Sequence, residues 1–260
     1  MKPTLKALLR DGRPAFGSWM QFGDPGIAEV LARAGFDWVA IDLEHSAIDL
    51  AAAFTLIQIV DLAGCAPLVR LSANDRVQAR RVMDAGAWGV IVPAVRSAAE
   101  ARQAVEAVKY PPQGIRGVGL GRAHGYGARF AEYMQEAGDC SVVIPMIEQK
   151  DGVERAEEIV GVPGVDAVFI GPYDLSASFG VPGQLNHPLV AEAMRHVVAA
   201  ARAAGKAAGI HVVHPPVGQV AERLAEGFRL IAYGGDMLFL VPAVHQAVDE
   251  LRTLTRDAGV

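Results

Sequence analysis

Two acidic side chains follow two apolar segments that lie close together in the chain. Glu148 follows 141–147 (SVVIPMI), and Asp174 follows 165–170 (VDAVFI) after a Gly-Pro-Tyr step. Residues 151–160 between them have helical spacing, so the two apolar segments are expected to be parallel, adjacent strands. Because neighbouring strands lie about 4.8 Å apart, both carboxylates would stand at one rim of a sheet.

Carboxylates this close repel each other unless they share a cation or a proton. A hard divalent cation, held by few protein oxygens and completed by water and substrate, meets that requirement. The pair therefore predicts a metal site formed by Glu148 and Asp174. The structural alternative is that Glu148 caps the following helix and Asp174 closes a turn.

A histidine follows another apolar segment, 36–43, and has acidic neighbours in the chain. His45 lies beside Glu44 and three residues after Asp42. Histidine is the usual general base near neutral pH, and a carboxylate partner fixes its tautomer. We therefore predict that His45 moves a proton, supported by Asp42. The alternative is a histidine that only caps the turn.

Arg70 stands near the end of the apolar segment 66–71. It would direct a fixed cation into the same pocket, where it suits a carboxylate or an enolate oxygen. A salt bridge to Glu44 or Glu148 is the alternative, and it is compatible with that role.

Other residues near these segment ends are candidates for substrate binding. Trp19 is expected to form a wall of the pocket, with core packing as the alternative. The Gly171-Pro172 step before the second carboxylate would leave backbone N–H groups able to hold a carboxylate. His211 and His214 are weaker candidates, and we expect neither to bind metal.

The lysines argue against a Schiff base, which is the other common way to form and break carbon–carbon bonds. Of the five, Lys2 and Lys6 belong to the N-terminal arm, Lys109 ends a predicted helix, and Lys206 precedes a strand. Lys150 alone stands near the right rim. A metal ion is therefore the better electron sink.

Strands and helices alternate along the whole chain. The predicted strands are 16–22, 36–43, 66–71, 89–95, 141–147, 165–170, 207–213 and 228–233. The predicted helices are 1–13, 26–34, 49–64, 74–85, 97–110, 128–137, 151–160, 188–204, 216–226 and 237–256, with a loop at 177–187. Continuous apolar runs are typical of parallel strands buried on both faces.

This alternation predicts an α/β protein that is a single-domain (β/α)8 TIM barrel over 1–260, with a doubly wound open sheet as the alternative. In such barrels the active site lies at the carboxyl ends of the strands, where the candidate residues stand. The Gly-, Arg- and Pro-rich segment 111–140 interrupts the rhythm, and a connection of this length is usually functional.

Composition restricts the kind of partner. The 260 residues carry a net charge of -5 and no cluster of Lys and Arg, so neither nucleic acid nor an anionic membrane is expected. Cys65 and Cys140 lack metal-site spacing and suit a reducing compartment. With no signal peptide and no apolar run near the roughly 20 residues of a membrane span, a soluble cytoplasmic protein is expected.

The motifs FGSWMQFGDP, WVAIDLEH, PLVRL, YPPQGIRGVG, GRAHGYG, PMIE and FIGPYDLS occur in this order. In sequence and spacing they resemble the HpcH/HpaI aldolase family of class II, metal-dependent pyruvate aldolases, of the 4-hydroxy-2-oxoheptanedioate and 2-dehydro-3-deoxyglucarate aldolase type. The resemblance covers nearly the whole chain. It departs at Tyr173, where the family commonly has a small residue, so the size of the aldehyde pocket is in question.

The resemblance implies Mg²⁺, Mn²⁺ or Co²⁺ on Glu148 and Asp174, chelated by a 2-oxo acid. It implies that Arg70 stabilises an enolate, and that His45 works with a metal-bound water and with Asp84 offered across a subunit interface. It also implies a hexamer, as a trimer of dimers that exchanges terminal helices, so the N- and C-terminal helices are expected to make oligomer contacts.

The interpretation is an aldehyde-lyase that cleaves a 4-hydroxy-2-oxo acid to pyruvate, or hydroxypyruvate, and an aldehyde. One alternative is oxaloacetate decarboxylation or acyl-CoA lysis at the same site, although no lysine cluster is present for a CoA diphosphate. Another is a barrel that binds a 2-oxo acid as a sensor or carrier without chemistry.

Overall fold

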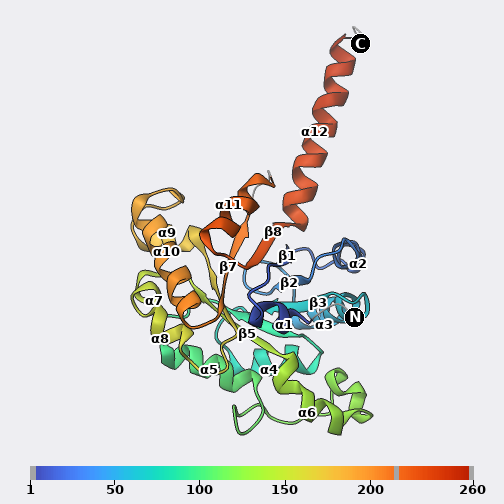
Figure 1. The fold of residues 1–260 in the computed structure, drawn as a ribbon. Helices are drawn as coiled ribbons and strands as arrows, with labels where there is room; N and C mark the ends of the chain where they lie inside the picture. The colour runs from blue at the N-terminus through green and yellow to red at the C-terminus, as the bar shows by residue number, and fades with distance from the viewer. Residues whose placement is uncertain (1–3, 214–216, 258–260) are drawn as a thin grey trace.

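Eight parallel strands close into a barrel in the order β1 to β8, with helices around it (Figure 1). The structure is a computed structural model and describes residues 4–213 and 217–257. The (β/α)8 barrel predicted from the sequence is therefore confirmed, and the open sheet is excluded. Neighbouring strands are consecutive in the chain all the way round, so every carboxyl end lies at one rim.

The strands are β1 (Ala15–Met20), β2 (Trp38–Asp42), β3 (Ala66–Arg70), β4 (Gly89–Val92), β5 (Val142–Ile147), β6 (Ala167–Ile170), β7 (Ala207–Val212) and β8 (Leu230–Gly235). The helices are α1 (Leu5–Arg10), α2 (Pro25–Arg33), α3 (Leu50–Leu62), α4 (Arg76–Asp84), α5 (Ala98–Val108), η1 (Arg122–Gly127), α6 (Phe130–Cys140), α7 (Lys150–Glu154), α8 (Ala156–Val160), α9 (Pro172–Ser178), α10 (Pro188–Ala203), α11 (Gly218–Glu226) and α12 (Asp236–Asp257).

Side chains on a strand alternate between its two faces, and this period of two divides the core into two layers. One buried cluster lies between the strands and the surrounding helices and includes Val39, Val69 and Ile147. The other fills the inside of the barrel with residues such as Leu68 and Ile144. Residues two positions beyond the last inward apolar side chain therefore face the rim from inside the barrel.

The amino end of the barrel is closed by α1. Its buried leucines, Leu5, Leu8 and Leu9, belong to the same cluster as the residues inside the barrel. Thr4 caps this helix by accepting a hydrogen bond from the Ala7 N–H. Because apolar side chains of α1 fill the amino end, a ligand would reach the interior of the barrel from the rim at the carboxyl ends of the strands.

Two predicted elements differ from the structure, and two others begin outside its described residues. The helix expected at 151–160 is two helices, α7 and α8, because Arg155 between them has non-helical backbone angles (φ −118°, ψ 23°). The expected loop at 177–187 begins only after α9, which starts directly at Pro172, a residue suited to a first helical turn. The first residues of the helices predicted at 1–13 and 216–226 lie outside the described part of the chain.

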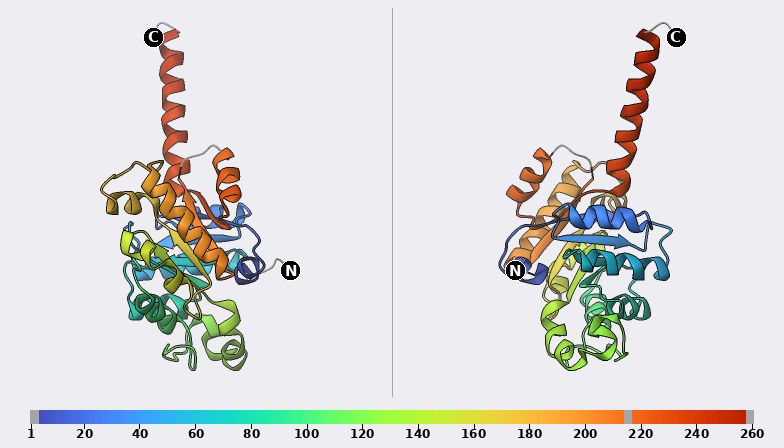
Figure 2. Two further views of the ribbon diagram at one scale, coloured as in Figure 1. Left: turned by 60° about the vertical axis from the view of Figure 1, so that its left-hand side comes forward. Right: turned by 90° about the vertical axis from the view of Figure 1, so that its right-hand side faces the viewer.

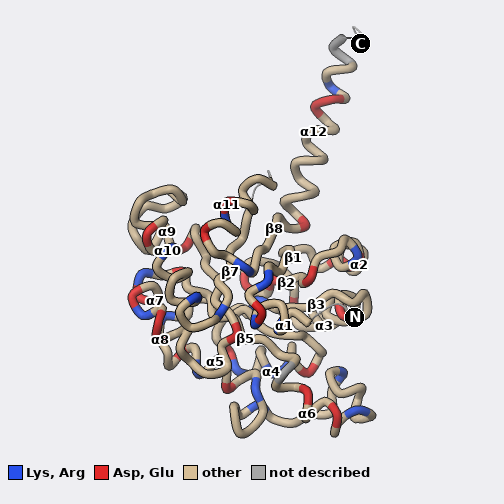
Figure 3. Tube along the Cα trace, viewed as in Figure 1, with Lys and Arg blue, Asp and Glu red and all other residues tan. Residues whose placement is uncertain are grey.

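The last helix, α12, projects away from the barrel instead of lying along it (Figures 1 and 2). Its exposed apolar side chains are Phe239, Leu240, Val241, Val244, Val248, Leu251 and Leu254. Charged residues of both signs are interspersed over the rest of the trace (Figure 3). Among the described helices, none has the length and apolar character needed to cross a lipid bilayer.

Candidate active site

A cavity of about 130 Å³ opens at the carboxyl ends of the strands. The charged side chains on its wall come from β2, β3, the end of β5 and the start of α9, and they are Asp42, Arg70, Glu148 and Asp174. Its remaining lining is Trp19, Gln21, Met146, Phe169, Ile170, Gly171, Pro172, Tyr173, His211 and Val213. The structure thus brings Glu148 and Asp174, the two predicted metal ligands, to the same cavity as Arg70 and Trp19.

Arg70 is held by Asp42, its direct register partner on the neighbouring strand. Arg70 Nε donates to Asp42 Oδ1 at 2.8 Å and Nη2 donates to Oδ2, while Nη1 lies 3.2 Å from Glu44 Oε2. Burial alone would raise the pKa of the Asp42 carboxyl, but the bonds and charge of Arg70 outweigh it and lower that pKa. The guanidinium is therefore a fixed cation at the cavity wall.

Glu148 is a buried carboxylate with an open side. Its Oε1 accepts a hydrogen bond from the Ala94 N–H at 2.7 Å. Its Oε2 lies where Gly171 leaves room, because a Cβ at that position would stand only 2.6 Å away. Burial, and then the charges of Glu44 and Asp174, raise the pKa of Glu148 to about 7 against the effect of the Ala94 bond. A bound cation would therefore stabilise the ionised form of the Glu148 carboxyl.

Asp174 lies in the first turn of α9 and is exposed. The strands β5 and β6 pair directly, with Ile147 opposite Ile170, so Glu148 and Gly171 follow at the same level. No group of three or more His, Cys, Asp or Glu suited to a metal occurs within 4–213 and 217–257. Two carboxylates fit a hard cation that takes its other ligands from water and substrate.

The Trp19 side chain packs inside the rim of the barrel. Its ring meets Phe169 edge-on, with the ring centroids 5.8 Å apart, and the Arg70 guanidinium carbon lies 4.7 Å from its centroid. Its indole N–H is buried and has no hydrogen-bond partner among the described residues. Buried donors are normally paired, so an acceptor on a bound ligand would satisfy this one.

His45 lies at the mouth and is not part of the cavity wall. Its ring is more than half exposed, and Nε2 lies 3.7 Å from Glu44 Oε2. The Asp42 carboxylate accepts from the backbone N–H of His45 and binds Arg70, and the expectation that Asp42 supports the imidazole stays a prediction. Glu44 is the acidic side chain near the ring. His214 lies outside the described residues.

Asp84 is far from this rim within one chain. It ends α4, which leads to the amino end of β4, and its Oδ1 lies 2.6 Å from Arg116 Nη2. The Arg116 guanidinium is itself packed on the ring of Tyr110, 4.6 Å from the centroid. A single chain therefore does not bring Asp84 to its own site.

Two contacts to the site were missed in the sequence. Gln21, directly after β1, donates from Nε2 to Asp42 Oδ2 and to the His45 carbonyl, both at 3.2 Å. Its position after an apolar strand is the same signal that identified Glu148. The other is the backbone N–H of Ala94, which donates to Glu148 Oε1. Ala94 has a φ of 53°, and a backbone conformation of this kind cannot be predicted from the pattern of side chains.

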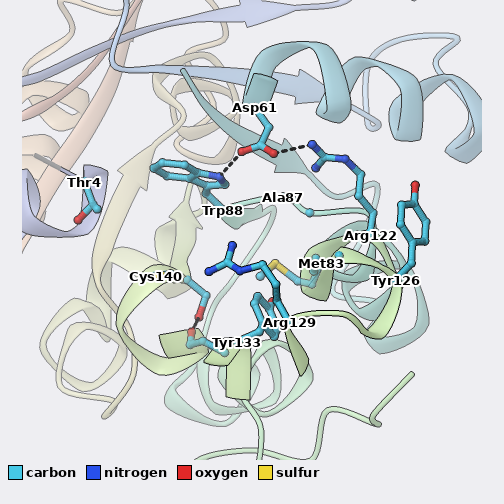
Figure 4. Close-up of a pocket in the computed structure, with 15 residues that line it drawn as sticks. Thr4, Asp61, Met83, Ala87, Trp88, Arg122, Tyr126, Arg129, Tyr133 and Cys140 are labelled. Atoms are coloured by element: carbon cyan, nitrogen blue, oxygen red, sulfur yellow. Dashed lines mark hydrogen bonds and ion pairs between the residues drawn. The ribbon is translucent and has the colours of Figure 1, made fainter. Parts of the chain in front are cut away.

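A larger cavity of about 450 Å³ lies at the opposite end of the barrel (Figure 4). It is bordered by Trp88, which precedes β4, and by η1 and α6. Asp61 accepts bonds from Trp88 Nε1 at 2.9 Å and from Arg122 Nη2 at 2.6 Å. These polar groups satisfy one another, and the carboxylates that predict metal binding are at the other rim.

Known proteins resemble this chain over almost its full length. The model of the HpcH/HpaI aldolase/citrate lyase family matches residues 15–243. A 4-hydroxy-2-oxo-heptane-1,7-dioate aldolase of Shigella sonnei is 41% identical over 246 residues, which cover 94% of this chain and 92% of that protein.

Solved structures resemble it as well. An HpcH/HpaI aldolase/citrate lyase family protein from Burkholderia cenocepacia has a TM-score of 0.90 at 36% identity, covering 95% of this chain and 98% of that one. An HpcH/HpaI aldolase from Desulfitobacterium hafniense has a TM-score of 0.88 at 32% identity, covering 95% and 96%.

Proposed function

The chain belongs to the HpcH/HpaI aldolase/citrate lyase family and is a carbon–carbon lyase, and from this we propose a metal-dependent aldolase that works in the cytoplasm. It cleaves a 4-hydroxy-2-oxo acid to pyruvate, or hydroxypyruvate, and an aldehyde, and it also runs in reverse. The observation that carries the proposal is the pair Glu148 and Asp174, which line one small cavity with a fixed arginine.

Glu148 and Asp174 would hold the cation, which is Mg²⁺, Mn²⁺ or Co²⁺. The room that Gly171 leaves beside Glu148 Oε2 and the raised pKa of this carboxyl support a cation there. When bound, such an ion withdraws electrons from a keto oxygen as a Lewis acid. The side chains of the cavity bind and orient the acid around it.

Arg70 and Trp19 are the groups that would hold the 2-oxo acid. Arginine has five N–H donors, and three of those of Arg70 face Asp42 and Glu44. Two donors remain for the carboxylate of the acid or for the oxygen that becomes an enolate. The unpaired Trp19 N–H supplies another donor beside them. Gly171, Pro172 and Tyr173 border the same volume.

His45 would take the proton when the bond breaks. In cleavage the 4-hydroxyl loses its proton, the bond between carbons 3 and 4 breaks, and the electron pair stays on carbon 3 as the pyruvate enolate. A proton returned to that carbon completes the methyl group. Glu44, 3.7 Å from the ring, supports a charged imidazole. Asp84 would reach this mouth from a second copy of the chain.

Metal removal tests the proposal. Excess EDTA is expected to abolish both aldol cleavage and the exchange of pyruvate methyl protons into D₂O, and restored Mg²⁺, Mn²⁺ or Co²⁺ is expected to recover both. Proton NMR follows the exchange, and coupled reduction of pyruvate follows the cleavage. Full activity in the chelated enzyme would contradict the metal assignment.

The same experiment separates the alternatives. Oxaloacetate that loses CO₂ much faster than any aldol is cleaved would favour a decarboxylase. Metal-dependent binding of pyruvate in a calorimeter, without any proton exchange, would favour a sensor or carrier.

The projecting α12 supports our proposal that the chain forms a homo-oligomer. Its exposed leucines, Leu251 and Leu254, are about two-thirds exposed in a single chain, and burial of such side chains is favourable. We expect α12 to pack on another copy within a hexamer built as a trimer of dimers, with α1 at a neighbouring contact. Light scattering is expected to give a mass near six times the 27.5 kDa chain.

The double variant Leu251→Glu and Leu254→Glu, which places charges on that face, is expected to lower the mass. A wild-type protein that remains monomeric at micromolar concentration would refute this arrangement.

A further inference from the structure

The loop that carries His45 is held by side chains and not by its own backbone. Residues 44–47 lie between β2 and α3 and make no backbone-to-backbone hydrogen bond within the described part of the chain. The N–H of His45 donates instead to the side chain of Asp42, at 3.3 Å from Oδ1. The side chains around this loop therefore determine its position.

Gln21 ties the loop to the neighbouring strand. It directly follows β1, and its side-chain Nε2 donates to the His45 carbonyl and to Asp42 Oδ2, both at 3.2 Å. A carboxylate and a carbonyl oxygen can only accept, so the NH₂ group of the amide must face the loop and Oε1 is turned away from it. His45 is therefore held at both backbone groups, at its N–H by Asp42 and at its C=O by Gln21.

The backbone of Gln21 is itself fixed from β8. The pairing of β1 with β8 changes register between Gly17 and Trp19. Beyond this shift, Asp236 accepts from the N–H groups of Gln21 and Phe22, with its Oδ2 at 2.8 and 2.7 Å from the two nitrogens. Asp236 follows β8 directly and is buried, so these bonds are stronger than they would be in water. The Gln21 amide thus reaches the loop from an anchored backbone.

We propose that Gln21 is a positioning residue, which sets the place of the His45 imidazole at the mouth of the cavity by holding the His45 carbonyl. This rests on the proposed function, in which His45 takes the proton of the 4-hydroxyl. The ring is more than half exposed, and its ion-pair partner is Glu44, 3.7 Å away on the same loop. The ring therefore moves with the loop, and a shift of about 1 Å in a catalytic group slows a reaction strongly.

A direct contact with the substrate is the rival role, because Gln21 also lines the small cavity. The NH₂ group of its amide already has two acceptors, which leaves Oε1 for a ligand. Positioning of a proton acceptor affects the chemical step, whereas a contact made equally in the ground state and the transition state affects KM. The two roles therefore differ in the kinetic parameter that a variant changes.

Gln21→Met tests the proposal, because methionine keeps the length of the side chain and has no N–H donor. Asp42 keeps its bonds from Arg70 in this variant, so the guanidinium stays fixed. The kcat of aldol cleavage is expected to fall about tenfold, while KM and the affinities for pyruvate and Mn²⁺ stay within about twofold of the wild type. An unchanged kcat, or a loss carried mainly by KM, would overturn the proposal.

Gln103→Met is the matched control. Gln103 is exposed on α5, and its amide also donates to a backbone carbonyl, that of Asn74, at 3.2 Å. It does not line the small cavity, so the kcat of this variant is expected to equal that of the wild type. Equal losses of kcat in the two variants would assign the effect of Gln21→Met to a general weakening of the fold and would overturn the proposal.

A double-variant cycle shows whether Gln21 acts through the imidazole. In a His45→Ala background, Gln21→Met is expected to lower the residual kcat by less than about twofold, because the group that Gln21 positions is gone. A full loss of about tenfold in that background would show that Gln21 acts on something else, and it would overturn the proposal.

The same measurements separate this inference from the proposed function. Wild-type kcat in His45→Ala alone, or no metal-dependent exchange of pyruvate methyl protons in the wild type, would count against the proposed function. Normal exchange in the wild type together with an unchanged kcat in Gln21→Met would count against this inference alone.

Discussion

At a divalent metal concentration that saturates the wild type, Glu148→Gln is expected to turn over a 4-hydroxy-2-oxo acid about a thousandfold more slowly than the wild type. Glutamine keeps the length of the side chain and can still accept the Ala94 N–H, but it removes one of the two proposed anionic ligands. Losing a Lewis acid costs a reaction several kcal/mol, and roughly 4 kcal/mol corresponds to a factor of about a thousand. A steady-state assay under a range of metal concentrations measures the change.

The control for this variant is metal binding, followed by calorimetry with Mn²⁺. The variant is expected to lose Mn²⁺ binding, because it has one anionic group fewer at the site. Its circular dichroism spectrum is expected to match that of the wild type, because burial disfavours the charge that the neutral amide replaces. Turnover close to that of the wild type would refute the assignment of Glu148 as a ligand.

The positions of the candidate site residues could be predicted from the sequence because all the strands of a (β/α)8 barrel follow one rule. Every parallel strand delivers its last inward residue to the same rim, and apolar runs are easily found. Glu148 and Arg70 each stand two residues beyond an inward apolar side chain, Met146 and Leu68, of the barrel interior. The fold and the gathering of these side chains therefore followed from counting along strands.

Pairings between side chains were harder to predict than positions. Asp42 was assigned to His45 because the two are three residues apart, but the register of β2 on β3 places it opposite Arg70, 28 residues away. Closeness in sequence is a weak guide where the chain turns sharply after a strand. Sheet register decides the partner, and it depends on tertiary packing.

Backbone features left even less trace in the sequence. The N–H that holds Glu148 belongs to Ala94, whose positive φ would be expected of glycine. The helix that carries Asp174 starts without any connecting loop after the Gly171 step, which the sequence alone presented as a turn. Asp84 could not be placed at a site at all, because its proposed contact requires a second chain.

Arg70→Ala is expected to lower kcat/KM about 10²- to 10³-fold, corresponding to roughly 3 kcal/mol for a lost donor to a developing oxyanion. It is also expected to destabilise the protein by about 3 kcal/mol, because it leaves the fully buried Asp42 carboxylate without its cation. The rate of exchange of pyruvate methyl protons into D₂O measures the first effect, and the midpoint of urea unfolding measures the second. The second effect complicates the first, since a weakened fold could reduce activity by itself.

A double variant separates the two effects. Asp42→Ala added to Arg70→Ala removes the stranded charge, so the urea midpoint is expected to recover most of its loss while kcat/KM stays low. The recovery arises because the pair occupies a buried position where two apolar groups are tolerated better than one unpaired ion. If activity recovered in step with stability, Arg70 would serve the fold through Asp42 and would not act on the substrate. The bidentate contact between them fixes the guanidinium at the cavity wall, so a loss of activity that persists in the double variant belongs to Arg70 itself.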